Sequence, residues 1–171
     1  VTDEMVKIAC EVKPAWVCLV PEKRQELTTE GGLDVIAGAE KIANAIKALH
    51  AVGSQVSLFI DPEPHQIDKS IELGADAIEL HTGAYGEAYL AGDAKKIAHE
   101  QQRIQQATNY AKTQHSTLLV NAGHGLTRDN VAAIANIEGI HELNIGHAIM
   151  ADSVFMGLQQ AVVAMRAAFA N

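Results

Sequence analysis

Short runs of apolar and β-branched residues recur along the chain, and polar residues and glycine follow each of them. Five of these runs have the length of a β-strand. They cover Ala15–Val20, Gln55–Ile60, Ala77–Leu80, Thr117–Val120 and Glu142–Ile145. The pattern therefore predicts five strands.

Apolar residues at helical spacing fill the segments before, between and after these runs. Pro14 ends the first such segment, while Gly53 and Gly74 supply stop signals for the second and third. The stripes run from Met5 to Val12, Ile42 to Val52, Ile67 to Ile71, Ala94 to Ala111, Val131 to Ile134 and Val154 to Phe169. We expect a helix in each.

The order is one helix followed by five strand–helix units. The gaps between strands accommodate the crossover helices that parallel strands require. Regular alternation of strand and helix predicts an α/β fold with a parallel sheet. No linker or composition break interrupts residues 1–171, so we expect a single domain.

Polar residues stand at or just after the carboxyl end of every predicted strand. This pattern is typical of a (β/α)8 TIM barrel, whereas a doubly wound sheet usually carries a G-x-G-x-x-G turn, which is absent. A barrel needs eight strands, and residue 1 is Val, not Met. We therefore expect the chain to be the last five βα units of a barrel plus the preceding helix, with three units before Val1. The polar strand ends are Glu22–Arg24, Asp61, Glu79–Thr82, Asn121–His124 and Asn144–His147.

Composition narrows the choice of partners and compartment. The 171 residues carry 13 Lys and Arg against 21 Asp and Glu, a net charge of −8, which argues against nucleic acid or an anionic membrane as the main partner. No apolar run approaches the roughly 20 residues of a membrane span, and no signal peptide is visible. Cys10 and Cys18 lie among apolar residues, so we expect them to be buried and reduced in the cytoplasm.

Two Gly–His turns occur late in the chain, at Asn121–Thr127 and Asn144–Ala148. Each follows a predicted strand and precedes a predicted helix, where backbone amides favour an anion. Barrels often bind phosphate in their last two βα loops. Gly123, Gly125 and Gly146 are therefore candidate phosphate contacts, although glycine here could also serve only to make a tight turn.

The strand around Ala77–Leu80 alternates, so Ile78 and Leu80 face one way while Glu79 and His81 face the other. Burial inside a barrel would raise the pKa of Glu79 and suit it to proton transfer near neutral pH. His124, between two glycines, is a second acid–base candidate. Each candidate also has an alternative without a catalytic role. Glu79 could instead pair with a Lys or Arg, and His124 could be a solvated loop residue.

The remaining histidines carry weaker signals. His81 and His147 stand at strand ends, whereas five others are expected at the surface, on helices or in loops: His50, His65, His99, His115 and His141. Glu79, His81, His124 and His147 could together bind a metal, but no H-x-H or H-x-x-x-H pair supports this, and we predict no metal site. The polar loop Pro21–Gly32 offers hydroxyls and amides to a substrate, or is simply solvated.

Five long motifs in a fixed order resemble the pyridoxine 5′-phosphate synthase family of bacterial vitamin B6 synthesis. The resemblance extends from Val1 to about Arg166. It rests on Val20–Glu26, Thr28–Asp34, Ile78–Gly83, Val120–Thr127 and His141–Ala148.

The resemblance implies a cytoplasmic, transferase-type enzyme on a (β/α)8 barrel that assembles into homo-oligomers, an octamer in the family. Members condense 3-amino-2-oxopropyl phosphate with 1-deoxy-D-xylulose 5-phosphate to give pyridoxine 5′-phosphate, phosphate and water, with no metal or redox cofactor. A non-catalytic phosphate-binding fragment and a metal-dependent hydrolase on the same barrel are the alternatives.

The resemblance also assigns roles to individual residues. Glu79 corresponds to the carboxylate that assists the transition state, and His124 to the proton donor. The substrate contacts are Gly125, Gly146 and His147 for 3-amino-2-oxopropyl phosphate and Thr28 for the deoxyxylulose phosphate. The family's Asn-x-Asp-His strand, Arg-bearing loop, His-Leu-Arg segment and a further catalytic Glu have no counterpart here, so we expect the 171 residues alone to be inactive.

Overall fold

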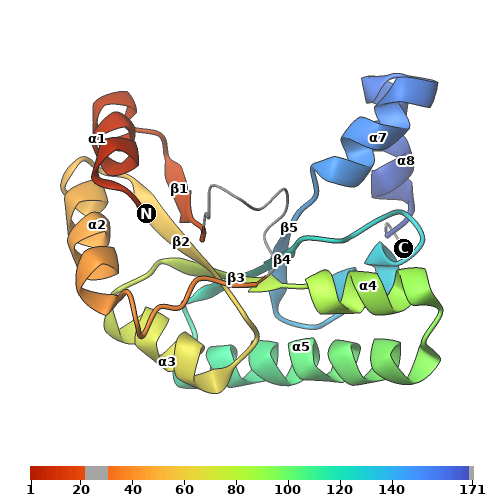
Figure 1. Cartoon of the computed structure of the whole chain (residues 1–171), viewed down its shortest axis with the longest axis horizontal. Coiled ribbons are helices and arrows are strands. Elements are labelled where there is room, and N and C mark those ends of the chain that lie inside the picture. Colours follow the sequence, from red (N-terminus) through yellow and green to blue (C-terminus); the bar gives the residue numbers. More distant parts are fainter. Residues whose placement is uncertain (22–30, 170–171) are drawn as a thin grey trace.

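The computed structural model describes residues 1–21 and 31–169, and Figure 1 shows the whole chain. Helices and strands alternate along most of this length. The elements are α1 (Asp3–Val12), β1 (Trp16–Leu19), α2 (Ala39–Ala51), β2 (Gln55–Ile60), α3 (Pro64–Glu72), β3 (Ala77–His81), α4 (Gly83–Ala91), α5 (Ala94–Gln114), β4 (Leu119–Gly123), α6 (Val131–Ala135), β5 (Ile140–Asn144), α7 (His147–Met156) and α8 (Leu158–Ala167).

The five strands form one sheet in which neighbours along the chain are neighbours in space. The order is β1-β2-β3-β4-β5, and every pairing is parallel. The predicted α/β class and the five parallel strands are therefore confirmed. All five carboxyl ends meet at one edge of the sheet, which is where ligand sites form in such folds.

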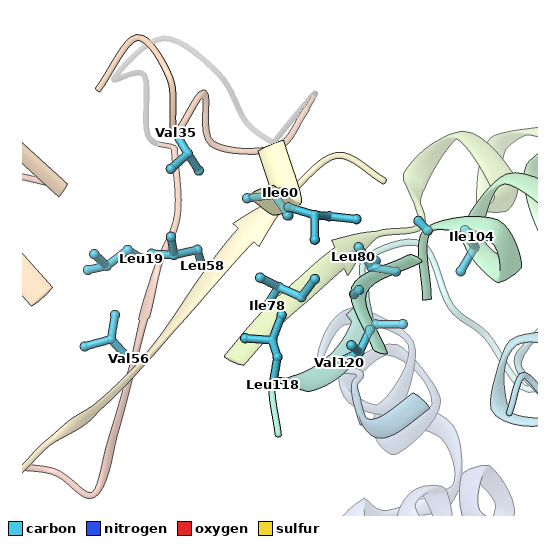
Figure 2. Packing of buried hydrophobic residues seen from close by; sticks show 14 of the residues in the cluster. Leu19, Val35, Val56, Leu58, Ile60, Ile78, Leu80, Ile104, Leu118 and Val120 are labelled. Atoms are coloured by element: carbon cyan, nitrogen blue, oxygen red, sulfur yellow. The ribbon is translucent and has the colours of Figure 1, made fainter. Parts of the chain in front are cut away.

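The core lies between the sheet and the helices that cover one of its faces. In Figure 1, α1, α2, α3 and α5 follow one another along that side. The strand side chains that point to these helices are aliphatic and fully buried (Figure 2), among them Val56, Leu58, Ile78, Leu80 and Val120. Ile78 and Leu80 therefore share one face of β3, as the alternation predicts, which leaves the other face for Glu79 and His81.

The bounds of β4 and β5 differ most from the prediction. Strand β4 ends at Gly123, not Val120, and β5 begins at Ile140 and ends at Asn144. The extension of β4 follows from pairing, because Glu79 and His81 of β3 stand opposite Asn121 and Gly123. Backbone hydrogen bonds between the parallel strands hold these polar and small residues in β4, although their residue types are not typical of a strand.

Two helices were not predicted correctly. Helix α4 was missed because Glu87 is its only charged residue and because it contains Gly83 and Gly86, so its sequence has no continuous polar face. The single helix expected from Val154 to Phe169 is in fact two helices. Gly157, with φ +80°, separates α7 from α8 at a conformation that favours glycine.

Several apolar residues lie on the surface. The stripe of Met5, Ile8 and Val12 on α1 is exposed, as are Phe155 and Leu158 on α7 and α8. The expectation that both cysteines are buried was wrong: both are free, Cys10 is half-buried, and Cys18 is exposed because β1 is an edge strand of the sheet. Among the described residues no helix is both long enough and apolar enough to span a membrane.

Candidate active site

Glu79 is a buried carboxylate at the carboxyl end of β3. Alternation along the strand turns it away from the apolar core, and its side chain is 8% exposed. Asn144 Nδ2, at the end of β5, donates to Glu79 Oε2 at 2.8 Å. The Cys18 thiol on β1 donates to the same oxygen at 3.6 Å. Side chains from three strands therefore meet at this carboxylate.

The surroundings of Glu79 raise its pKa above the usual value. Burial is the main cause, while the hydrogen bonds from Asn144 and Cys18 partly oppose it and the negative charge of Glu142 adds to it. Water is excluded from the thiol where it faces Glu79, and this local desolvation, together with the negative charge of Glu79, raises the pKa of Cys18 to about 12. The thiol therefore keeps its proton although the residue as a whole is exposed. The predicted upward shift of the Glu79 pKa is confirmed in direction and in cause.

Gly123 provides the space that Glu79 occupies. A Cβ at position 123 would overlap Glu79 Oε1 and would also press on the backbone oxygen of Asn144. Gly123 thus has a steric role that the sequence does not indicate, and its phosphate contact stays a prediction. The absent side chain is what allows a carboxylate to sit between β3 and β4.

His124 follows Gly123 directly and has an unusual backbone conformation. Its φ is +78°, in the left-handed region that non-glycine residues rarely adopt. The Thr82 hydroxyl lies within hydrogen-bond reach of the carbonyl oxygens of both Gly123 and His124 and can donate its proton to one of them at a time. The imidazole pKa is lowered by burial first and by the charge of His81 second.

Glu79 and His124 line the same pocket, which has a volume of about 460 Å³. The pKa of the carboxylate is raised and that of the imidazole is lowered, so the two values are shifted toward each other, as is typical of acid–base pairs. The pocket residues come from the ends of β1 to β5 and from the loops that follow β4 and β5: Val20, Phe59, Glu79, His124, Gly125, Leu126, Thr127, Asn144, Ile145, Gly146, His147 and Ala148.

The second Gly–His turn supplies a helix start on the rim of this pocket. Gly146 is the N-cap of α7 and His147 is its first residue. A Cβ at Gly146 would meet nothing within 4 Å, so the backbone there is open to a ligand. The free amides at the start of a ten-residue helix favour an anion, as the sequence predicts.

The first Gly–His turn does not stand at a helix start, contrary to expectation. Helix α6 begins only at Val131, and Gly125 lies in the intervening loop with φ +73°. Asn130 braces this loop, because its Oδ1 accepts from Thr127 N at 2.8 Å and its Nδ2 donates to Gly125 O at 3.0 Å. The hydroxyl of Tyr85 in turn donates to Asn130 O at 2.8 Å.

Helix α4 packs closely against the same loop. A Cβ at Gly86 would come within 2.6 Å of Gly125 O and 3.0 Å of Gly125 Cα. Gly86 therefore sets the position of the loop that carries Gly125. Sequence reasoning missed Gly86 and Asn130, because contacts between a loop and distant residues leave no signal in either segment.

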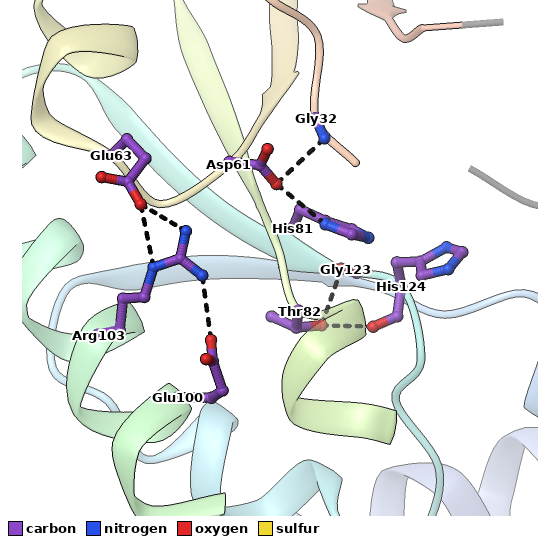
Figure 3. A network of polar contacts seen from close by, with 9 residues as sticks. All are labelled: Gly32, Asp61, Glu63, His81, Thr82, Glu100, Arg103, Gly123 and His124. Atoms are coloured by element: carbon purple, nitrogen blue, oxygen red, sulfur yellow. Dashed lines mark hydrogen bonds and ion pairs between the residues drawn. The ribbon is translucent and has the colours of Figure 1, made fainter. Parts of the chain in front are cut away.

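A larger hollow of about 960 Å³ adjoins the pocket and shares His124, Gly125 and His147 with it. His81 lines the larger hollow, with Nδ1 3.1 Å from Asp61 Oδ1 (Figure 3). Arg103 also borders the hollow, but its guanidinium is paired with Glu63 at 2.6 Å and Glu100 at 3.1 Å.

The polar loop after β1 is only partly described. Thr28 and Glu22–Arg24 lie outside the described residues. At the end of this loop Gly32 N donates to Asp61 Oδ1 at 3.1 Å, and Leu33 N donates to Phe59 O at 2.7 Å. A Cβ at Gly32 would overlap the backbone at Ile60 and Asp61, so this close approach to β2 requires glycine.

The other histidines behave as expected at the surface. All five are exposed, although His141 lies on β5 and not on a helix or loop: His50, His65, His99, His115 and His141. Within the described ranges, no three His, Cys, Asp or Glu side chains are grouped so that they could hold a metal ion. The four residues considered for metal binding therefore do not converge as a ligand set.

The chain was compared with protein-family models and with known proteins. Residues 1–171 match the family model "Pyridoxal phosphate biosynthesis protein PdxJ" over their whole length. The chain belongs to the PdxJ family. A relative from a Sulfurihydrogenibium species, named pyridoxine 5′-phosphate synthase, is 52% identical over 170 residues, which are 99% of this chain and 68% of the relative.

Solved structures of low identity share the fold. One described as "Native KDPGal structure" has a TM-score of 0.61 at 18% identity and aligns with 98% of this chain. A 3-keto-L-gulonate-6-phosphate decarboxylase from Vibrio cholerae has a TM-score of 0.62 at 15% identity and aligns with 96%. This PdxJ-family chain spans 66% and 65% of those two chains. The likeness supports an α/β fold of TIM-barrel type.

Proposed function

We propose that this chain carries the carboxyl-terminal part of a pyridoxine 5′-phosphate synthase. The reaction is the condensation of 3-amino-2-oxopropyl phosphate with 1-deoxy-D-xylulose 5-phosphate, which releases phosphate and water. Membership of the PdxJ family and the 52% identical synthase support this activity. The condensation involves imine formation, dehydration and ring closure, and each step moves protons.

In this proposal Glu79 and His124 are the acid–base groups of the described part of the site. Glu79 stabilises positive charge that develops on the condensing intermediates, and its raised pKa also allows it to exchange a proton near neutral pH. His124 donates a proton to a departing oxygen. Its lowered pKa makes the imidazolium a stronger acid than a free histidine.

The glycine turns are the proposed phosphate contacts. Gly125, Gly146 and His147 hold 3-amino-2-oxopropyl phosphate, since they line the pocket beside His124 and since α7 begins there. Thr28 is the proposed contact to the deoxyxylulose phosphate. Both substrates are small and phosphorylated, and neither nucleic acid nor a membrane takes part.

The proposal extends to the whole protein. The five βα units are the last five of a (β/α)8 barrel, and three earlier units supply the remaining strands and catalytic groups. The 171 residues alone are therefore inactive. The complete protein works in the cytoplasm as a homo-oligomer, as the family resemblance implies, with an octamer the expected form.

One observation carries the proposal: Glu79 on β3 and His124 in the loop after β4 border one pocket whose rim is the start of α7. Had these side chains pointed to opposite faces of the sheet, no single substrate could have met both. The pocket therefore unites a carboxylate, an imidazole and an anion-binding helix start.

The test is His124→Asn in the full-length protein. Asparagine tolerates the positive φ at this position better than most residues, so the fold is kept while the ionisable ring is lost. We expect synthase turnover to fall by roughly 100-fold or more. His65→Asn, at an exposed site on α3, is the matched control and retains full turnover.

Unchanged turnover in the His124→Asn enzyme would remove this residue from the mechanism. If the wild-type protein makes no pyridoxine 5′-phosphate but still binds inorganic phosphate, the non-catalytic alternative holds. Activity that requires added divalent metal and disappears with a chelator would favour the hydrolase alternative.

A further inference from the structure

His81 carries a buried ring nitrogen that the proposed reaction leaves unused. The side chain is 9% exposed. Its Nε2 is buried, and no donor or acceptor in the described part of the chain contacts it. A buried polar atom without a partner is costly, and such atoms in a native fold usually have a functional reason.

Asp61 determines which ring nitrogen of His81 carries the proton. Its Oδ1 lies 3.1 Å from His81 Nδ1, and hydrogen bonding from His81 is the main reason why the pKa of Asp61 is lowered. An ionised carboxylate can only accept, so Nδ1 carries the proton and the neutral ring presents Nε2 as an acceptor. The Gly32 amide, which also donates to Oδ1, holds the carboxylate in place.

The His81 ring is also confined by its neighbours. Phe59 packs edge-on against it with centroids 5.1 Å apart. His124 lies on the other side at 5.0 Å, and Figure 3 shows the free end of the His81 ring pointing toward it. A Cβ at Gly83 would come within 2.5 Å of His81 Nε2 and 3.0 Å of His124 Cδ2, so glycine is needed for the two rings to meet.

We propose that His81 is a positioning residue for His124, with Asp61 holding the His81 ring and His81 Nε2 accepting a hydrogen bond from the His124 imidazole. The 5.0 Å separation leaves room for an N–H···N bond of about 3 Å once a ring nitrogen of His124 turns toward His81. This bond directs the other nitrogen of His124 toward the pocket that it shares with Glu79. The inference deepens the proposed function and rests on it.

Charged groups around His124 also affect its pKa. Positive charge on His81 or His147, when either is protonated, lowers the pKa of His124, whereas Glu87 on α4 raises it. A neutral His81 that accepts from His124 acts in the opposite direction, because an acceptor beside the imidazole favours its protonated form. The charged or titratable groups that face the two rings are Asp61, Glu79, Glu87, Arg103 and His147.

The experiment compares His81→Gln with His81→Asn in the full-length protein. Gln reaches the place of Nε2 and offers an acceptor there. Asn reaches only the place of Nδ1, so it can donate to Asp61 but leaves no acceptor toward His124. We expect His81→Gln to keep kcat within about threefold of wild type and His81→Asn to lower kcat roughly tenfold or more, with KM for both substrates nearly unchanged.

A second readout does not depend on catalysis. The pKa of His124, followed by NMR through its ring C–H signal, falls in His81→Asn, because the acceptor lost in this variant favours the protonated imidazole, and stays closer to wild type in His81→Gln. His99→Gln, an exposed histidine on α5, is the control and leaves the signal unmoved. Equal kcat in the Gln and Asn variants, or a His124 pKa that does not fall in His81→Asn, would overturn the proposal.

The two proposals fail in different ways. If the wild-type protein has no synthase activity, the proposed function is lost, yet the NMR titration still reports whether His81 and His124 are coupled. If the enzyme is active and both variants behave as wild type, only the positioning role is lost.

Discussion

At the scale of single residues, the site depends on small and neutral partners as much as on its ionisable groups. Glu79 and His124 could be predicted because strand alternation and a Gly–His turn are visible in the sequence. The role of Gly123 was not visible, since it arises only when β3 and β4 pair in register. Thr82, which supports the backbone of His124, was hidden for the same reason.

Gly123→Ala tests whether the space beside Glu79 is required. The new methyl group overlaps the carboxylate and presses on backbone, so Glu79 must move. We expect a loss of about 1–3 kcal/mol in the free energy of unfolding and a strong fall in kcat. Denaturant melts and turnover assays measure both, with Gly38→Ala at the start of α2 as control. Wild-type turnover in Gly123→Ala would show that the position of Glu79 is unimportant.

Asn144→Ala tests the hydrogen bond that supports the Glu79 carboxylate. Asn144 lowers the pKa of Glu79, so its removal raises that pKa further. Because the proposed mechanism uses ionised Glu79, activity is lost as pH falls through this pKa. The acid limb of the kcat/KM profile therefore moves to higher pH, whereas Asn109→Ala on α5 leaves it in place. A limb that stays put or moves to lower pH contradicts this account.

At the scale of elements, the strand–helix alternation was predictable but the element that supports the site was not. Helix α4 has no continuous polar face, so its periodicity gives no signal, and its glycines look like helix breakers. Their purpose appears only in three dimensions, where Gly86 lies against the backbone of Gly125. Close packing between a helix and a loop cannot be read from either segment alone.

Gly86→Ala tests that packing. Ordinary helix propensity would make this change stabilising by up to about 1 kcal/mol. Here the Cβ meets backbone atoms of Gly125, so we expect lower stability and a several-fold higher KM for 3-amino-2-oxopropyl phosphate. Ala91→Val, at the exposed end of the same helix, serves as control. A stabilised variant with unchanged KM would show that α4 does not set the loop position.

At the scale of the whole molecule, the parallel order of the strands followed from the sequence, because short strands separated by helical segments allow few other arrangements. The sequence did not predict which apolar residues would lie on the surface. Periodicity showed that Met5, Ile8 and Val12 share a face, but not that this face is left exposed. Which apolar stripe meets the core depends on how α1 crosses α2, and sequence spacing does not contain that angle.

Hydrogen exchange tests the proposed barrel. If three further strands close it, both β1 and β5 have neighbours on each side in the full-length protein. The amides of Trp16–Leu19 are then protected to a similar degree as those of Ala77–His81 in the centre of the described sheet. Mass spectrometry of short peptides resolves the two strands. Rapid exchange of the β1 amides, as in an open edge, would argue against a closed barrel.

The central claim is that one pocket brings the proton-transfer pair Glu79 and His124 together with an anion-binding helix start. A crystal structure of the full-length protein with inorganic phosphate bound tests it most directly. We expect phosphate density within about 3 Å of the amides of Gly125 or of Gly146 and His147, facing the His124 ring. Phosphate bound only elsewhere, with this pocket empty at saturating concentration, would contradict the account.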